Sequence, residues 1–351
     1  MVFAGGGFRF GIYLGMYAAA RDAGRAPDVL LATCGGAIAA AIIQALPDDA
    51  QRKAWLSSPQ MYQFWGSLQP APQARISKVL LGAARRKWSR QPAAVVPDLF
   101  HDYLFELPPV LPLPPIAADS EVDVVTIGGK LLYGPADVGQ PRGSRKLFAQ
   151  TVFGPPRAAA LAQGMASPFA DPRWGAHAVH DTVLTDTTLP LEQAARMSIT
   201  DFYYFPSHRF AGDHYIGGVV DLFPIELARR LADAVMIEFK ESFDQTFSIP
   251  AWRAVLGLDG NQRLRQVNGQ PADVWFDTSD VTTALSVQRI GKQLDWRRNR
   301  IRLALPADHA TYARYMDAQW QYGYQRGLEA LQRPAPGDTA GMRNVNRYNR
   351  G

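Results

Sequence analysis

Short apolar runs alternate with helical stretches over the first fifty residues. The runs at 2–4 and 29–33 are mostly apolar, and the stretches at 11–23 and 35–46 carry apolar side chains at helical spacing. Two strands joined by a helix usually lie parallel in one sheet. The pattern therefore predicts a strand, helix, strand, helix unit at the start of an α/β fold.

Residues 51–118 lose this rhythm and contain ten prolines. Proline removes a backbone donor and interrupts helices, so we interpret the stretch as an irregular insertion or lid. Within it, residues 74–90 place apolar side chains on one helical face before a basic end that includes Arg85 and Arg86. Such a segment fits a helix packed on the domain, a helix lying on an anionic membrane, or a cover over the active site.

The rest of the chain continues the same kind of pattern. We expect helices at 225–234 and 308–331. We expect strands at 122–127, 131–133, 203–205, 215–220, 235–239 and 296–303. Residues 334–351 are rich in Pro, Gly, Asn and Arg, which favours a disordered basic tail. We assign residues 1–333, the rest of the chain, to one α/β domain.

Composition and charge narrow the functional classes. With 351 residues, 47% hydrophobic and 20% charged, the chain is globular rather than disordered, collagenous or coiled coil. A net charge of +5 favours anionic partners such as a membrane surface, and no nucleic-acid motif accompanies it. Because Met1 runs almost at once into glycines without a charged or apolar leader, we expect a cytoplasmic protein with at most peripheral membrane contact. The oligomeric state is not determined by the sequence.

A glycine run follows the first predicted strand. Gly5, Gly6 and Gly7 precede Arg9 and the first helix. Backbone N–H groups in such a loop approach a ligand closely, and the helix N-terminus favours phosphate or a developing oxyanion. A tight turn or a nucleotide loop gives the same pattern, although a phosphate-binding loop would end in Lys-Ser or Lys-Thr.

The second strand runs into Ala32-Thr33-Cys34-Gly35-Gly36, which has the shape of a nucleophile elbow. This sharp turn needs small residues two positions before and two after the nucleophile, and Ala32 and Gly36 meet that need. The following helix N-terminus favours a thiolate at Cys34. The alternative is that Cys34, the only cysteine, is a small buried hydrophobic residue.

Together, the loop Gly5–Gly7 with Arg9 and the elbow at 32–36 resemble the patatin-like phospholipases. That family combines a Gly-Gly-Gly-x-Arg/Lys-Gly loop with a Gly-x-Ser-x-Gly elbow about twenty-five residues later. Residues 194–198 resemble its alanine-rich helix, and 214–224 resemble the segment with its second catalytic residue. The resemblance implies a three-layer α/β fold with a largely parallel central sheet, acyl transfer or hydrolysis on lipid-like esters, and no cofactor or metal.

The chain departs from the family pattern at both catalytic positions. The family uses a Ser-Asp dyad, whereas here Cys34 stands at the serine and Ile216 at the aspartate. Phe10 and Ala32 also replace glycines of the two motifs. A nearby carboxylate would raise the pKa of a thiol, so Ile216 is compatible with a cysteine that accepts acyl groups from activated donors, above all thioesters. The alternative is a catalytically inactive relative that binds lipid or a protein partner.

Few side chains are available to assist Cys34. His214 precedes Ile216 by two residues, so strand alternation places both on one face, and His214 is our candidate base. A surface or core histidine is the alternative. We expect the N–H groups of Gly6, Gly7 and Gly35 to bind the oxyanion. Three further residues complete the predicted binding set, namely Gly5, Arg9 and Gly36.

Overall fold

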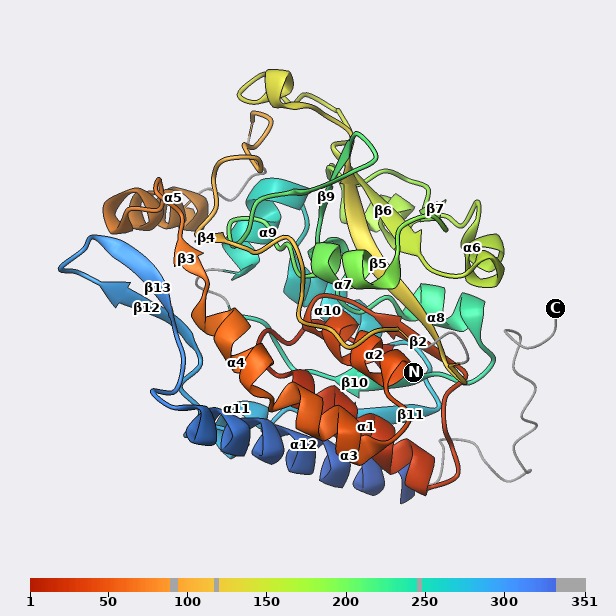
Figure 1. The fold of residues 1–351 in the computed structure, drawn as a ribbon. Coiled ribbons are helices and arrows are strands. Elements are labelled where there is room, and N and C mark those ends of the chain that lie inside the picture. Colours follow the sequence, from red (N-terminus) through yellow and green to blue (C-terminus); the bar gives the residue numbers. More distant parts are fainter. Residues whose placement is uncertain (89–93, 117–119, 245–247, 333–351) are drawn as a thin grey trace.

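A computed structural model describes residues 1–88, 94–116, 120–244 and 248–332 (Figure 1). The predicted tail at 334–351 lies outside this range, so its disorder stays a prediction. None of the helices within these limits has the length and apolar character needed to cross a bilayer.

A mixed sheet forms the centre of the fold. Its strands follow the order β1-β2-β5-β6-β7, with β9 against β5 and β8 against β9. The first three strands are parallel, and β6 and β9 run antiparallel to β5. The sheet is therefore partly rather than largely parallel. The bounds are β1 (Val2–Phe3), β2 (Val29–Ala32), β5 (Asp123–Leu131), β6 (Phe148–Phe153), β7 (Leu184–Asp186), β8 (His208–Phe210) and β9 (Asp213–Ile216).

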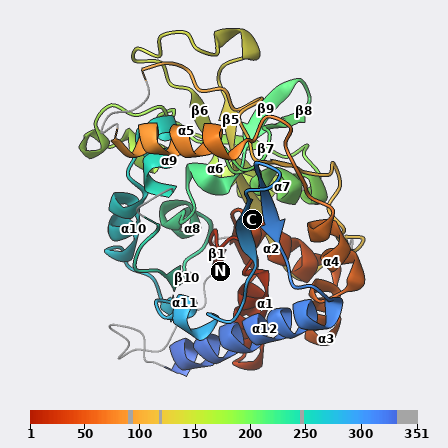
Figure 2. The ribbon, with the colours of Figure 1, turned by 90° about the vertical axis from the view of Figure 1, so that its left-hand side faces the viewer.

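Helices cover both faces of this sheet, as the three-layer prediction requires. Phe3 and Leu30 belong to a core shared with α1 (Phe10–Asp22), α2 (Gly35–Ala45) and α12 (His309–Gln332). Their neighbours Val2 and Leu31 belong to a second core. Successive side chains of a strand point to opposite faces, which explains this separation. The second core includes residues of α8 (Ile225–Leu231), α9 (Ser248–Leu256) and α10 (Gly260–Asn268). Figure 2 shows α8 and α10 on one side of β1 and α2 on the other.

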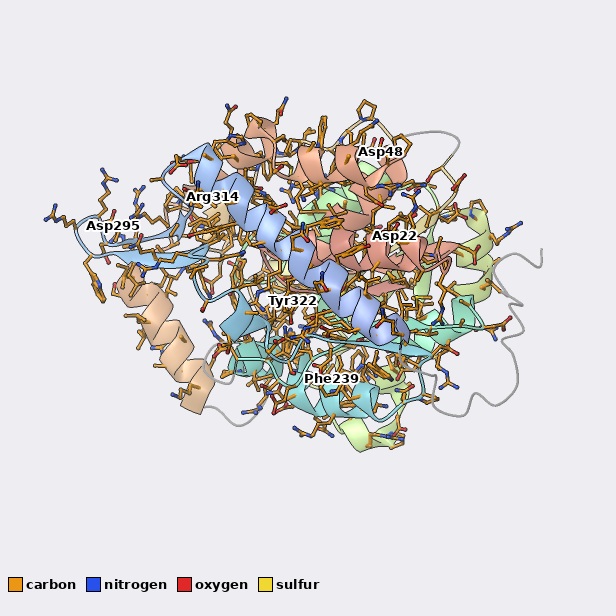
Figure 3. The ribbon with its side chains drawn as sticks, turned by 90° about the horizontal axis from the view of Figure 1, so that it is seen from below. Asp22, Asp48, Phe239, Asp295, Arg314 and Tyr322 are labelled. Carbon is orange, nitrogen blue, oxygen red and sulfur yellow. The ribbon has the colours of Figure 1, made fainter. Side chains whose placement is uncertain are left out.

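The last helix lies directly against the first (Figure 3). A Cβ at Gly15 would lie 2.1 Å from the Trp320 carbonyl oxygen, and one at Gly323 would lie 2.0 Å from that of Ile12. Only glycine allows two helix backbones to approach so closely. The C-terminal helix is thereby fixed to the helix that follows the glycine loop.

The interpretation of 51–118 as irregular is wrong for part of that stretch. It contains α4 (Pro59–Gly66) and α5 (Ile76–Trp88), and α3 (Asp49–Leu56) runs into it. Pro59 starts α4 rather than breaking it, because the first position of a helix needs no backbone donor. Two short strands, β3 (Gln69–Pro70) and β4 (Phe105–Glu106), pair between the helices.

Several predicted strands have different limits. Leu131 ends β5, so 131–133 is not a separate partner strand, and 203–205 makes only an isolated bridge from Tyr203 to Tyr103. The strand at 215–220 ends at Ile216, where two glycines lead into a short 3-10 helix. The predicted strand at 296–303 is instead the turn and second strand of a hairpin. That hairpin consists of β12 (Gly291–Asp295) and β13 (Arg300–Ala304).

The remaining elements extend the same layers. The predicted strand at 235–239 is confirmed as β10 (Met236–Phe239), which pairs in parallel with β11 (Val274–Asp277). The other helices are α6 (Pro156–Ala162), α7 (Leu191–Ser198) and α11 (Val281–Ala284).

Candidate active site

Cys34 sits on a sharp turn between β2 and α2. Its backbone has φ 48° and ψ −126°, a conformation that non-glycine residues rarely adopt. Gly36 lies so close to β1 that an added Cβ would be 2.4 Å from the Phe3 carbonyl oxygen. Thr33 donates a hydrogen bond from Oγ1 to the Leu222 carbonyl oxygen, 3.0 Å away. The local geometry is that of a nucleophile elbow, in which the turn is held from two sides.

The end of α7 also anchors this turn. The Cys34 N–H donates to Ser198 Oγ at 2.9 Å, and Ser198 Oγ donates in turn to the Ile127 carbonyl oxygen at 2.8 Å. Ser198 is fully buried. Buried polar groups are costly unless they are paired, so this chain of bonds fixes the backbone of Cys34 relative to the sheet.

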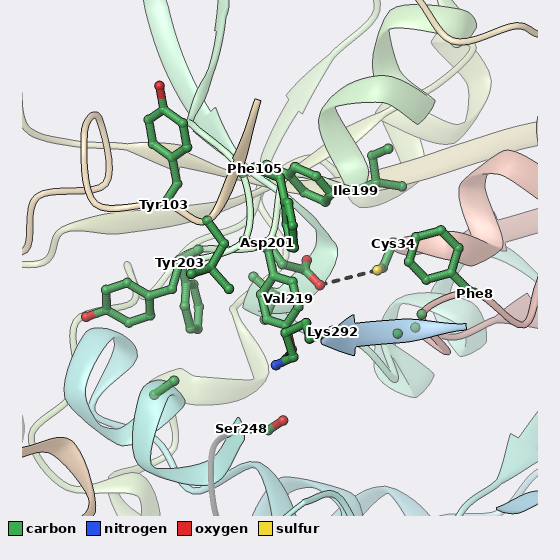
Figure 4. Close-up of a pocket in the computed structure, with 18 of the residues that line it drawn as sticks. Phe8, Cys34, Tyr103, Phe105, Ile199, Asp201, Tyr203, Val219, Ser248 and Lys292 are labelled. Carbon is green, nitrogen blue, oxygen red and sulfur yellow. Dashed lines mark hydrogen bonds between the residues drawn. The ribbon is translucent and has the colours of Figure 1, made fainter. Parts of the chain in front are cut away.

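A carboxylate meets the thiol. The Cys34 Sγ–H group donates to Asp201 Oδ2 at 3.3 Å, and Figure 4 shows the two side chains pointing toward each other. Asp201 follows α7 by three residues. Its enclosure by protein raises the pKa of this carboxyl to about 7, because burial disfavours the charged form. Within the described chain, Asp201 Oδ1 is buried without a hydrogen-bond partner, so one oxygen of the carboxylate is uncommitted.

Burial raises the pKa of the Cys34 thiol well above its ordinary value, and the negative charge of Asp201 raises it further. The backbone N–H groups of Gly7 and Gly35 bond the sulfur and oppose this increase. At neutral pH the thiol is therefore protonated, and ionisation requires a base. Asp201 is the carboxylate placed to accept that proton.

The glycine loop faces the same sulfur. Gly7 has φ 61°, and a Cβ on Gly35 would be 2.6 Å from the Gly7 carbonyl oxygen, so loop and elbow are in close contact. Gly5, Gly6, Arg9 and Gly35 line one cavity together with Gly7 and Cys34. Gly36 is buried behind the turn and does not line the cavity.

This cavity has a volume of about 730 Å³ and extends from Cys34 toward α5 and β12. Aromatic side chains such as Phe8, Phe105 and Tyr203 form much of its wall (Figure 4). A cavity of this size with apolar walls can hold an acyl chain or a similar organic group. Basic side chains also line the cavity, among them Lys78, Arg85, Arg86, Lys240 and Lys292.

His214 does not reach Cys34. It lies on β9, where Nδ1 is 3.2 Å from Ser207 Oγ and the ring packs edge-on against Phe100 at 4.9 Å. It does not line the cavity, and burial lowers the pKa of its ring. The geometry therefore does not support His214 as the base.

Ile216 is 1% exposed and packs into the core against Gly129 of β5. The glycines that follow it contact the site instead. A Cβ on Gly217 would lie 2.9 Å from Asp201 Oδ1, and one on Gly218 would lie 2.9 Å from the Cys34 nitrogen. Because residues 217 and 218 have no side chains, there is space beside the elbow. The Asp201 side chain, which follows α7, lies in that space.

Sequence reasoning did not identify Asp201 or Ser198 as members of the site. Asp201 is the only carboxylate residue between Glu192 and Asp213, and it lies three residues after the alanine-rich segment 194–198 that resembles the family pattern. The absence of other carboxylates in this stretch of sequence is the one feature that could have pointed to Asp201. In the part of the chain that the structure describes, no group of three or more His, Cys, Asp or Glu side chains could hold a metal ion.

Comparison with known proteins agrees with the geometry of loop and elbow. The model of the family described as patatin-like phospholipase matches residues 1–229, well over half of the chain. The match includes the glycine loop, Cys34, α7 and Asp201. Comparison with curated proteins gave no match. The chain belongs to the patatin-like phospholipase family, a family of lipid acyl hydrolases.

Proposed function

We propose that the protein hydrolyses or transfers acyl groups of a lipid-like ester or thioester, with Cys34 as nucleophile and Asp201 as general base. The observation that carries this proposal is the 3.3 Å contact between Cys34 Sγ and Asp201 Oδ2. A nucleophile and a base within hydrogen-bond reach, beside oxyanion donors, form the minimal arrangement for acyl transfer.

In the first half of the reaction, the Asp201 carboxylate accepts the Sγ proton while the sulfur attacks the substrate carbonyl carbon. The carbonyl oxygen becomes an oxyanion, and the N–H groups of Gly7 and Gly35, which bond the reacting sulfur, are the candidate donors to it. The bond from the acyl carbon to the leaving oxygen or sulfur then breaks. The leaving group takes the proton from Asp201, and the acyl group stays on Cys34 as a thioester.

In the second half, water or another acceptor attacks the thioester. Asp201 accepts the acceptor's proton and returns it to the Cys34 sulfur as the carbon–sulfur bond breaks. Asp201 thus supplies the proton that an alkoxide leaving group needs. Oxygen esters are consequently substrates as well.

Turnover of a substrate panel tests the proposal. The panel contains acyl thioesters and activated oxygen esters of several chain lengths, and product release is followed for the native chain, Cys34→Ala and Asp102→Asn. Asp102 lies in the same cavity but pairs with Lys78 at 3.7 Å. Its replacement therefore controls for the loss of a cavity side chain that does not contact Cys34. We expect release by the native chain and the control and none by Cys34→Ala. Release that persists in Cys34→Ala would contradict the assignment, and no release at all would favour a lipid-binding protein.

A further inference from the structure

Apolar side chains stand exposed on α5 and on the hairpin turn beside it. Leu80 and Leu81 of α5 are 41% and 55% exposed, and Trp296, at the turn between β12 and β13, is 68% exposed. Single exposed apolar residues are common on protein surfaces. Here, however, they gather on two adjacent elements that project from the same side of the molecule (Figure 1).

The same two elements are strongly basic. Within α5, Lys78, Arg85 and Lys87 are exposed and no residue is acidic. The hairpin residues 291–304 contain five Lys or Arg residues and one acidic residue, Asp295. At the turn, Arg297 and Arg298 are exposed, and Arg298 lies 3.9 Å from Asp295. Basic and apolar groups are thus interspersed on one surface.

Backbone contacts join α5 to the hairpin. Ile76 donates its N–H to the Asn299 carbonyl oxygen at 3.3 Å, and Arg75 bridges to Arg300. Both elements also border the catalytic cavity, to which α5 contributes Leu81 and the hairpin contributes Lys292. We call α5 together with residues 291–304 the docking face. Whatever binds this face lies next to the cavity.

We propose that the docking face binds an anionic lipid bilayer and so places the cavity at the membrane surface. Tryptophan favours the interface between headgroups and acyl chains, and leucine favours the apolar side of that boundary. Lysine and arginine are attracted to anionic headgroups. A nucleic acid would satisfy the charges but not the exposed leucines and tryptophan. The proposal does not rest on the chemistry of Cys34.

Vesicle flotation with full-length Cys34→Ala protein tests the proposal without turnover of the lipid. The vesicles contain phosphatidylcholine alone or phosphatidylcholine with about one third phosphatidylglycerol. The test variant is Arg297→Glu/Arg298→Glu. The control is Arg229→Glu/Arg230→Glu, which makes the same charge change at two exposed positions of α8, on the side of the molecule away from α5 (Figure 1).

We expect Cys34→Ala and the control to bind anionic vesicles more tightly than neutral ones. The test variant should lose at least about tenfold in affinity, since each reversed charge weakens attraction to the anionic surface. Trp296→Ala and Leu81→Ser should also lower binding. Equal binding of test variant and control, no preference for anionic lipid, or binding to an RNA oligonucleotide but not to vesicles would overturn the proposal. Circular dichroism confirms that each variant is folded.

Discussion

At the residue scale, Cys34 and Asp201 control each other's ionisation. The negative charge of Asp201 raises the pKa of the thiol, and the thiol hydrogen bond partly offsets the effect of burial on the carboxyl. In the proposed reaction, the same carboxylate that suppresses free thiolate is the base that removes the proton during attack. Thiol reactivity and acyl transfer should therefore respond in opposite directions when Asp201 is neutralised.

Asp201→Asn removes this negative charge while keeping the size of the side chain. We expect alkylation of Cys34 by iodoacetamide at pH 7.5 to become faster, on the order of tenfold, because the thiol pKa falls. Acyl transfer should fall by about 100-fold or more because the base is lost. Mass spectrometry measures both rates. If both fall together, Asp201 holds the structure of the site rather than acting as a base.

The pH dependence of acyl transfer should follow the ionisation of the Asp201 carboxyl. Its pKa is raised to about 7, so the basic form increases as pH rises through that value. We expect kcat/KM of the native chain to rise with an apparent pKa near 7 and then to level off. This limb should be absent from the residual activity of Asp201→Asn. A limb that survives the substitution belongs to another group.

The free energy of unfolding should fall as pH rises, whereas the rate of acyl transfer increases. A carboxyl whose pKa is higher in the folded state favours folding when protonated, and that contribution is lost as pH rises from about 4 to about 7. Asp201→Asn should therefore be more stable than the native chain at pH 8, by about 2–4 kcal/mol, and similar to it at pH 4. Denaturant unfolding at both pH values measures this. An equal effect at the two pH values would exclude titration of Asp201 as the cause.

At the scale of elements, the last helix supports the glycine loop. The Gly11 N–H donates to Gln319 Oε1 at 3.2 Å, and Gln319 Nε2 donates to the Phe8 carbonyl oxygen at 2.8 Å. Gln319 is 1% exposed and lies on α12, beyond the residues that the family model matches. A segment outside the family match thus fixes the chain just after Gly7.

Gln319→Leu removes both bonds and leaves the Phe8 carbonyl oxygen without this donor. We expect kcat for acyl transfer to fall by roughly tenfold with a smaller change in KM, because misplaced oxyanion donors weaken transition-state binding. Alkylation of Cys34 should be unchanged. Gln325→Leu, at an exposed position of the same helix, is the control. A loss confined to stability, with kcat unaltered, would show that Gln319 has no positioning role.

For helices with a clear hydrophobic periodicity, the predicted ends lie within one or two residues of the observed ones. The helices expected at 11–23 and 308–331 are Phe10–Asp22 and His309–Gln332. Helical periodicity depends on local spacing, so one sequence suffices to show it. The strand Phe148–Phe153 was missed because all its residues are buried, which leaves no alternation to detect. Within 51–118, the helical segment recognised at 74–90 is α5, whereas α4 was missed because proline at a helix start resembles a break.

At the scale of the whole molecule, the site combines segments that are distant in sequence. Loop and elbow could be predicted because each is a local motif next to its own strand. The contact between Cys34 and Asp201 spans 167 positions, and the bond from Gly11 to Gln319 spans 308. Spacing along the chain carries no information about such contacts. They depend on how α7 and α12 pack against α1 and α2.

The most direct test of the account is intact-protein mass spectrometry after brief exposure to an acyl thioester or activated ester. The native chain and Asp102→Asn should gain one acyl group, which peptide mapping places on Cys34. Cys34→Ala should gain none, and Asp201→Asn should gain it about 100-fold more slowly. Equal acylation of the native chain and Asp201→Asn, or an acyl group on any other residue, would contradict the assignment of Cys34 and Asp201 as nucleophile and base.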